Sequence, residues 1–242
     1  MPSRSPAEKL RSTLPKVPKV PKVPGVSRRQ QYSASTKRAL VDQAAKLFTT
    51  KGYAATSLDA IVASARVTKG ALYHHFSGKQ AVFEAVFEKI EADASTRVRK
   101  ALKESRDPWE KALIGLRAFL DIVQDPGYQR VVIQEGPAVL GYERFREQEE
   151  RSSFGLVQEL VKAVLEESST EISPDMLETF SRIFFGALSA AGESVSTAAN
   201  PKAAVAQVET AIAFILAGLR SLTESGIGLP DPEDLLPEAD DE

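Results

Sequence analysis

Apolar residues recur at helical spacing through most of this chain. Between residues 35 and 51 they follow one face of a helix, at Leu40, Val41, Ala44, Leu47 and Phe48. A longer stripe predicts a long helix beginning near residue 80, at Val82, Phe83, Val86, Phe87, Ile90, Ala94 and Val98. No segment alternates apolar and polar residues with the period of two that a half-buried strand shows. The pattern therefore predicts an all-α fold.

Capping residues indicate where the first helices begin and end. Gly52 is expected to end the helix over 35–51. Thr56 and Asp59 have the spacing of a capping box and predict a second helix that begins at Thr56. Thr68 is expected to cap a third helix that ends near Phe76. A second capping box, at residues 77–80, would start the long fourth helix.

The later helices share one device, an N-cap residue followed by a proline in the first turn. It occurs at residues 107–108, 125–126, 173–174 and 200–201. The expected helices are 108–123, a helix from Pro126 to a break at Gly136-Pro137, and then 142–167, 174–198 and 201–224. The fold is thus an N-terminal three-helix domain with a helix-turn-helix, followed by a helical body, with about nine helices in all.

Residues 57–76 form the most informative segment, because two short amphipathic helices joined by a tight turn make a helix-turn-helix. The second of these helices would turn Leu72 and Phe76 inward and the following residues outward: Lys69, Gly70, Ala71, Tyr73, His74 and His75. Lysine, histidine and tyrosine can meet phosphates, and small residues allow close approach to base edges. Periodicity alone also permits an ordinary three-helix core with a polar surface.

Charge is distributed unevenly along the chain. Residues 1–80 contain fifteen Lys/Arg and three acids, a net charge of +12, so the other residues carry −14 of the total of −2. A basic end that attracts a polyanion and an acidic body that avoids it suit a DNA-binding protein with a regulatory module. The ordinary variation of charge along any chain is the weaker explanation.

The expected domains are a disordered, basic, proline-rich arm over 1–33, a DNA-binding domain over 34–94, a body over 95–228 and an acidic tail over 229–242. Prolines at 15, 18, 21 and 24 favour an extended backbone in the arm. The arm either touches DNA phosphates or is a solvated leader without a role, and the sequence leaves both interpretations open.

Several other classes of protein are disfavoured. The chain has no cysteine, and so neither a disulfide framework nor a thiolate metal site. Its longest apolar run, residues 211–219, is too short to span a bilayer, and no helix couples a basic face to a strongly apolar one, so we expect no membrane partner. No secretory signal precedes the helices. These features predict a cytoplasmic protein.

An enzyme is also disfavoured, and no catalytic residue, cofactor or metal is expected. The two histidines, His74 and His75, are adjacent on one helix, where side chains point about 100° apart and cannot share a substrate atom. No phosphate-binding glycine motif or nucleophile elbow is present. An architectural DNA-binding protein would explain the arm but not the large acidic body.

Several positions together resemble the TetR family of bacterial repressors: residues 52–58 (GYAATSL), residues 67–76 (VTKGALYHHF) and Lys79. The resemblance covers about residues 34–94 and implies that the third helix enters the major groove. It implies phosphate contacts from Thr56, Tyr73, His75 and Lys79 and base readout by Lys69, Ala71 and His74. The full set expected at DNA also contains Ser57, Thr68 and Gly70. The long basic leader departs from the family pattern.

The same resemblance implies a small-molecule cavity in the body and a dimer. Expected ligand contacts are Trp109, Phe119, Glu135, Tyr142, Phe154, Phe184 and Glu193. The two glutamates could instead satisfy a broken helix end or a dimer contact, and we favour that structural role. A flank of small residues would let two subunits approach closely: Gly186, Ala187, Ala190 and Ala191.

These features together predict a transcriptional regulator, interpreted as a homodimeric repressor. It would sit on a palindromic operator in double-stranded DNA until a small apolar effector of unknown identity releases it. The alternatives are a TetR-like activator and a DNA-binding protein that responds to no ligand.

Overall fold

The structure, a computed structural model, describes residues 28–167 and 172–226. The proline-rich arm up to residue 27 and the acidic tail lie outside the described residues. Every regular element within the described residues is helical, which confirms the predicted fold class. Residues 36–226 belong to one compact unit.

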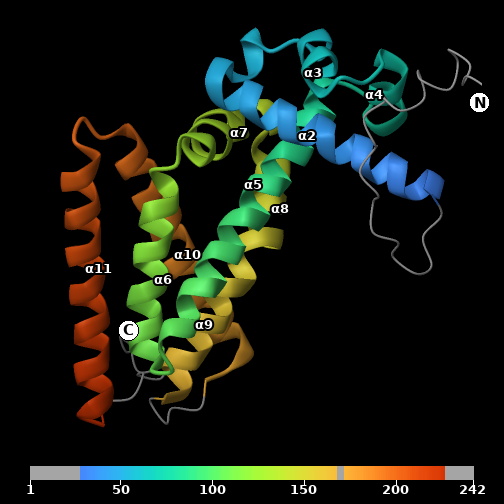
Figure 1. Cartoon of the computed structure of the whole chain (residues 1–242). Helices are drawn as coiled ribbons and strands as arrows, with labels where there is room; N and C mark the ends of the chain where they lie inside the picture. The colour runs from blue at the N-terminus through green and yellow to red at the C-terminus, as the bar shows by residue number, and fades with distance from the viewer. Residues whose placement is uncertain (1–27, 168–171, 227–242) are drawn as a thin grey trace, which may run out of the picture. The chain divides into compact units, whose positions relative to one another are not determined.

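The first elements are α2 (Arg28–Ala55), α3 (Leu58–Ala65), α4 (Lys69–His75) and α5 (Lys79–Ala101). The body follows with η2 (Leu102–Glu104), α6 (Pro108–Val123), η3 (Tyr128–Glu135), α7 (Gly136–Leu140), α8 (Tyr142–Glu149), η4 (Glu150–Phe154), α9 (Gly155–Glu167), α10 (Pro174–Thr197) and α11 (Pro201–Glu224). We call residues 36–78 the head and residues 102–226 the body; α5 joins the two (Figure 1).

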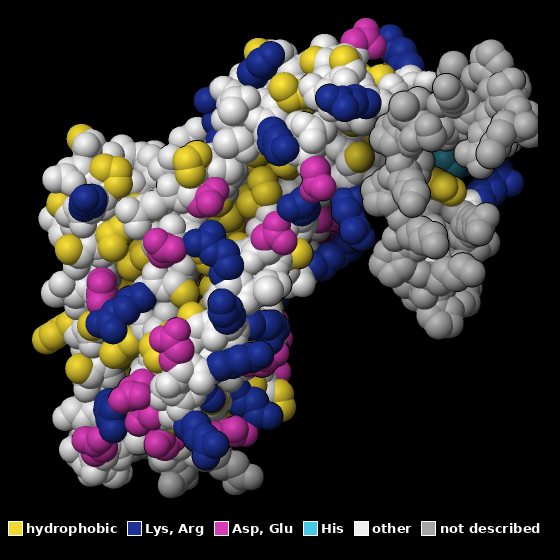
Figure 2. All heavy atoms as spheres, viewed as in Figure 1, with side chains coloured by type: hydrophobic (Ala, Val, Ile, Leu, Met, Phe, Trp, Pro, Cys, Tyr) yellow, Lys and Arg dark blue, Asp and Glu magenta, His cyan; other side chains and the backbone are white. Residues whose placement is uncertain are grey.

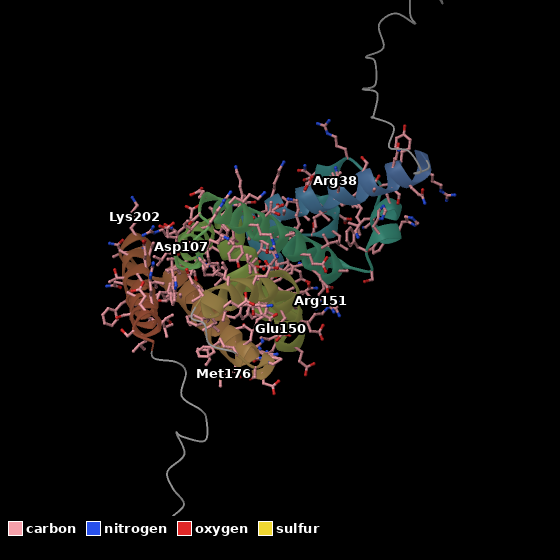
Figure 3. All side chains as sticks on the ribbon, turned by 90° about the horizontal axis from the view of Figure 1, so that it is seen from below. Arg38, Asp107, Glu150, Arg151, Met176 and Lys202 are labelled. Carbon is pink, nitrogen blue, oxygen red and sulfur yellow. The ribbon has the colours of Figure 1, made fainter. Side chains whose placement is uncertain are left out.

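The head is held together by one apolar core. Phe48 of α2 and Phe83 of α5 are fully buried, and their rings meet edge to face at 5.3 Å. Ile61 of α3 and Leu72 of α4 are fully buried in the same cluster. Because one buried side chain anchors each short helix, the polar faces of α3 and α4 are fixed in orientation. Arg38 stands on the exposed surface of α2 (Figure 3).

The body is a set of helices packed along the far half of α5. Ala94 and Val98 of α5 are buried, as are Leu116 and Leu120 of α6, and all four belong to the same cluster. Helix α6 packs against α5, α9, α10 and α11 and is thus central to the body (Figure 1). Helix α11 is the outermost of them.

Three helix starts confirm the predicted caps. The side chains of Asp107, Ser173 and Asn200 each accept a hydrogen bond from the backbone N–H three residues on, at 2.9 to 3.2 Å. Thr68 caps α4 in the same way. The carboxylate of Asp125 accepts from the N–H of Gly127 at 2.9 Å.

Other predicted boundaries were wrong. The first helix begins at Arg28, so residues 28–33, which the sequence assigned to the disordered arm, are helical; the last proline of the arm is Pro24, and nothing after it forbids a helix. Ser57, not Thr56, caps α3. Helix α5 begins after Gly78, which has no side chain with which to cap it, and the side-chain amide of Gln80 donates to the carbonyl of Val139.

The expected break at Gly136-Pro137 is absent. The chain continues as a helix through η3, which is π-helical, into α7, and it bends only at Gly141, where φ is +81°. A proline inside a helix clashes with the carbonyl four residues earlier, and the wider turns of η3 relieve that clash. Gly136 is fixed by packing, since a Cβ there would lie 3.0 Å from the ring of Phe87 and 3.1 Å from that of Phe145.

Helix α11 leaves much of its apolar surface uncovered. Phe214 is 81% exposed, and Ile215 and Leu222 are about half exposed; apolar side chains are visible along this edge of the molecule (Figure 2). By length and composition alone α11 could cross a membrane, because its 18-residue window has a mean hydropathy of 1.5. The uninterrupted apolar run over residues 211–219 is shorter than this helix, because polar residues interrupt the apolar ones elsewhere along it.

Candidate nucleic-acid interface and ligand pocket

Helix α4 presents a polar face from a buried anchor. Leu72 is fully buried and Phe76 nearly so, which fixes the roll of the helix about its axis. On the opposite side Tyr73 is 54% exposed, and Thr68, Lys69, Gly70 and His74 are also exposed, whereas Ala71 is half-buried. The structure therefore exposes four members of the outward set that the sequence predicted, Lys69, Gly70, Tyr73 and His74, and leaves Ala71 and His75 half-buried.

A tight turn sets α3 against α4. Arg66 adopts the left-handed conformation, with φ at +55°, and its N–H donates to the carbonyl of Ala63. This arrangement ends α3 abruptly. Asp59 of α3 and Lys69 of α4 then form an ion pair of 2.7 Å, which raises the pKa of the lysine. Both side chains are exposed, so the pair costs little to break, and Lys69 remains available to a phosphate or base.

Two expected phosphate contacts face inward instead. Thr56 is buried, and its hydroxyl donates to the carbonyl of Gly52 at 2.8 Å. Lys79 donates to the carbonyls of Tyr53 at 2.7 Å and Thr56 at 2.9 Å, and its ammonium lies 4.2 Å from the centre of the Tyr53 ring. The last carbonyls of a helix lack hydrogen-bond partners within that helix. At the end of α2, Thr56 and Lys79 provide the donors for these carbonyls.

His74 and His75 differ in their surroundings. His74 is exposed, whereas His75 is half-buried. Burial, with the nearby charges of His74 and Lys37, lowers the pKa of His75. Burial therefore favours the neutral form of His75, which can offer a hydrogen bond to a phosphate. Ser57, whose Oγ caps α3 at 3.1 Å from the N–H of Ala60, remains exposed at the start of that helix.

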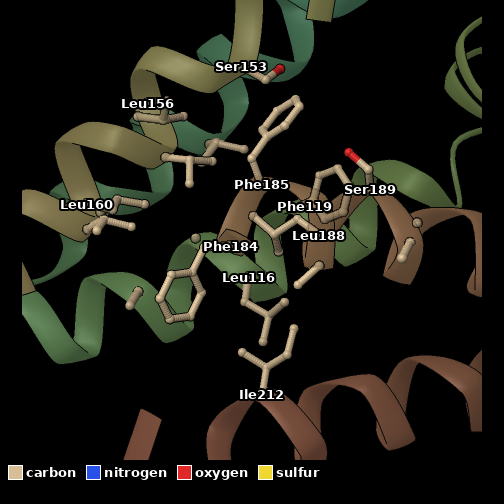
Figure 4. A pocket seen from close by; sticks show the side chains of 18 of the residues that line it. Leu116, Phe119, Ser153, Leu156, Leu160, Phe184, Phe185, Leu188, Ser189 and Ile212 are labelled. Atoms are coloured by element: carbon tan, nitrogen blue, oxygen red, sulfur yellow. The ribbon is translucent and has the colours of Figure 1, made fainter. Parts of the chain in front are cut away.

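The body contains a cavity of about 670 Å³. Its wall is mainly apolar, and rings and aliphatic chains from α6, α9, α10 and α11 point toward it (Figure 4). Four of the predicted ligand contacts line it: Trp109, Phe119, Phe184 and Glu193. A volume of this size accommodates a drug-sized molecule.

The other three predicted ligand contacts lie elsewhere. Tyr142 is 73% exposed. Phe154 packs its ring edge to face on Phe185 at 5.7 Å and does not line the cavity. Glu135 accepts a hydrogen bond from the N–H of Tyr53 at 2.9 Å and from Arg130 at 3.3 Å. Glu135 thus has a structural role, as expected, but a different one from the broken helix end or dimer contact that the sequence suggested: it ties η3 to the end of α2.

A polar cluster at the cavity was not predicted from the sequence. Glu91 is only 2% exposed, and its carboxylate accepts from the hydroxyls of Ser152 at 2.6 Å and Ser153 at 2.8 Å. Tyr128 also hydrogen-bonds to Glu91. Burial, then the charge of Glu91, raises the pKa of Glu149 to about 7. One signal was available, because Glu91 lies on the buried stripe of α5, four residues after Phe87.

The small residues of α10 face in two directions. Gly186, Ala187 and Ala190 are exposed, but Ala191 is buried against the body. Ala187 and Ala190 also border the cavity. Gly186, Ala187 and Ala190 therefore form an exposed flank of small residues on α10, and Ala191 is not part of it. Ile183 on the same helix is 61% exposed.

Comparisons with known proteins agree across both halves of the chain. The family described as "Bacterial regulatory proteins, tetR family" matches residues 40–86, and "Tetracyclin repressor-like, C-terminal domain" matches residues 109–219. The Transposon Tn10 TetC protein of Escherichia coli is 30% identical over 141 residues, which cover 57% of this chain and 70% of that protein.

Two further relatives extend the comparison. The HTH-type transcriptional activator FasR of Mycolicibacterium smegmatis is 31% identical over 94 residues, 38% of this chain and 43% of FasR. Among solved structures, a TetR-family transcriptional regulator from Pectobacterium atrosepticum superposes with a TM-score of 0.68 at 28% identity. That match covers 80% of this chain and 97% of the other.

Proposed function

This chain belongs to the TetR family of bacterial DNA-binding transcriptional regulators, and on that premise we propose that it is a dimeric, cytoplasmic repressor released from a palindromic operator by a small, largely apolar effector. The observation that carries the proposal is the pairing, in one compact unit, of the exposed polar face of α4 with the cavity of about 670 Å³.

The DNA contacts follow from the exposed residues of the head. Tyr73, His74 and Lys69 project from α4 beyond its anchored side, where they would meet base edges and phosphates in the major groove. Ser57, Thr68, Gly70, Ala71 and His75 border them. Thr56 and Lys79 would act by holding the end of α2 in place.

A second copy of the chain is the proposed cover for α10 and α11. The exposed apolar side chains of these helices are Ile183, Phe214, Ile215 and Leu222. Patches of this kind mark interaction sites, and a head that binds one half-site needs a partner for the second half-site, about 34 Å away along the duplex. Gly186, Ala187 and Ala190 would let the partner approach α10 closely.

The segment η3 offers a route from the cavity to the head. Tyr128, Val132 and Ile133 line the cavity. At the other end of η3, Glu135 binds the N–H of Tyr53 in the head. A ligand that displaces η3 would therefore act on the end of α2, in addition to any movement of α5, and would change the separation of the two heads.

The test begins with the operator. Genomic fragments retained by the purified protein would be sequenced, and the shared sequence tested in gel-shift titrations. We expect a palindrome with half-sites one helical turn apart or a multiple of that distance. Retention of fragments with no shared sequence would contradict the proposal.

An activator is the second candidate, because FasR is named as one. A reporter gene downstream of the operator distinguishes the two, since a repressor lowers its expression and an activator raises it. A regulator without a ligand is disfavoured by the large apolar cavity.

A further inference from the structure

The charged groups around the cavity all have one sign. Glu91 from α5, Glu149 from α8 and Glu193 from α10 line it, and the described lining residues contain no lysine, arginine or histidine. The remaining wall is dominated by rings and aliphatic side chains such as Phe119 and Phe184 (Figure 4). A ligand would therefore meet a largely apolar surface with a negative pole.

Glu91 is a fixed part of this pole. Its carboxylate is held by hydroxyl donors from two segments, Ser152 and Ser153 on η4 and Tyr128 on η3. Ser153 and Tyr128 also line the cavity. Because these donors converge on a side chain that is nearly fully buried, they hold the carboxylate in place at the edge of the cavity.

Glu149 has no such partners. Within residues 28–167 and 172–226, no hydrogen bond or ion pair involves its carboxylate, although burial and the nearby Glu91 both disfavour its charged form. The Arg146 guanidinium acts on it in the opposite direction but forms its ion pair with Glu150, at 3.5 Å. A positive group placed beside Glu91 and Glu149 would relieve an unfavourable arrangement of two like charges.

We propose that the effector is an amphiphilic organic cation, with an aromatic body among the phenylalanines and a protonated amine held by Glu91 and Glu149. An anion would meet only like charge in this wall, and a neutral ligand could donate a hydrogen bond to Glu149 but would not offset the like charge of Glu91. The inference rests on the proposed function, because it takes the cavity as the effector site.

A matched series of probes tests the charge preference. 2-Naphthylmethylamine, 2-naphthalenemethanol and 2-naphthoate share one ring system and differ in the charge of a single head group. Binding to the full chain would be measured by ligand-observed NMR at pH 7.5. We expect the amine to bind at least about ten times more tightly than the alcohol, as befits a charge-assisted contact, and the carboxylate not to bind.

Substitutions then locate the effect. Glu149→Gln and Glu91→Gln are each expected to weaken amine binding about tenfold and alcohol binding less than twofold; Glu149 is the safer variant for folding, since it is less buried. Glu147→Gln is the control, because it removes the same charge from the exposed face of α8.

The outcomes separate two failures. Three results would overturn the proposal of a cationic ligand but leave the pocket in place. They are equal binding of amine and alcohol, tighter binding of the carboxylate, and an equal loss of amine binding in the Glu147→Gln control. Absence of binding by all three probes counts against the effector pocket of the proposed function, and the inference falls with it.

Discussion

Tyr73 and His74 are the exposed side chains of α4 best placed to reach DNA. Tyr73→Ala or His74→Ala should weaken operator binding by about 1–3 kcal/mol per half-site. Their exposure predicts that the helical circular dichroism signal and the melting temperature stay unchanged. Gel-shift titration of both variants measures the effect, and affinities equal to that of the unmodified protein would contradict the assignment of α4 to the major groove.

A substitution of Lys79, unlike one of Tyr73 or His74, should lower the stability of the fold. Lys79→Met removes the ammonium that satisfies the carbonyls of Tyr53 and Thr56, and the loss of these contacts should lower the free energy of unfolding by about 1–3 kcal/mol. Urea unfolding monitored by circular dichroism measures it. Unchanged stability with weaker operator binding would instead restore Lys79 as a phosphate contact.

The raised pKa of Glu149 makes stability depend on pH. The folded protein binds this proton more tightly than the unfolded chain, whose carboxyl titrates near its ordinary value of 4.5. The contribution of Glu149 to the free energy of unfolding is therefore complete below pH 4.5 and is lost as the pH rises through about 7. Glu91, Tyr128, Arg146 and Glu150 surround the group and act on it or on its neighbours.

Glu149→Gln should remove this pH dependence. Because the carboxyl is partly solvated, we expect a gain of about 2 kcal/mol at pH 8 and little change at pH 4.5. Urea unfolding at the two pH values measures it, with Glu147→Gln as the exposed control. An identical change of stability with pH in the Glu149→Gln variant and the unmodified protein would show that another group is responsible.

At the scale of helices, two glycines that each begin a helix, Gly136 in α7 and Gly155 in α9, have different roles. A Cβ at Gly136 would lie 3.0 Å from the ring of Phe87, while nothing lies within 4 Å of a Cβ at Gly155. Gly136→Ala should cost about 1–3 kcal/mol through overpacking. Gly155→Ala should instead stabilise by up to about 1 kcal/mol, as alanine does within an exposed helix. Thermal melts that rank the two variants the other way would disprove this account.

The helix starts were predictable because their signals are local. Asp107-Pro108 and Asn200-Pro201 carry both the cap and the first turn in adjacent residues. The unbroken helical passage from the π-helical η3 into α7, which contains Pro137, was not predictable, because Gly136 there packs against Phe87 and Phe145. Tertiary contacts of this kind leave no periodic trace in the sequence.

The candidate site also has one part that could be predicted from local sequence and another part that only the tertiary structure decides. The outer face of α4 follows from helical geometry once Leu72 and Phe76 are assigned inward. The inward role of Thr56 depends on the exact course of the chain after Gly52. The pairing of Glu91 with Ser152 and Ser153 joins residues about sixty positions apart, and only the fold brings them together.

At the scale of the whole molecule, the proposed dimer is tested most directly on α11. Phe214 is 81% exposed and, unlike Ala187, does not line the cavity. Phe214→Glu should place a charge in the interface and convert a dimer to monomers at micromolar concentration. Sedimentation velocity measures it, with Thr96→Glu on the exposed face of α5 as the control. A monomeric unmodified protein would contradict the dimer.

The cavity in the body also bears on how long the protein survives in a cell. A ligand that binds only the folded state adds stability in proportion to the logarithm of its concentration, about 2.7 kcal/mol at one hundred times its Kd. Proteases act on the small unfolded fraction. We therefore expect a filled cavity to slow turnover, so that an effector which takes the protein off DNA would also let it accumulate. Recovery of repression after the effector is withdrawn would then start from a larger stock of protein.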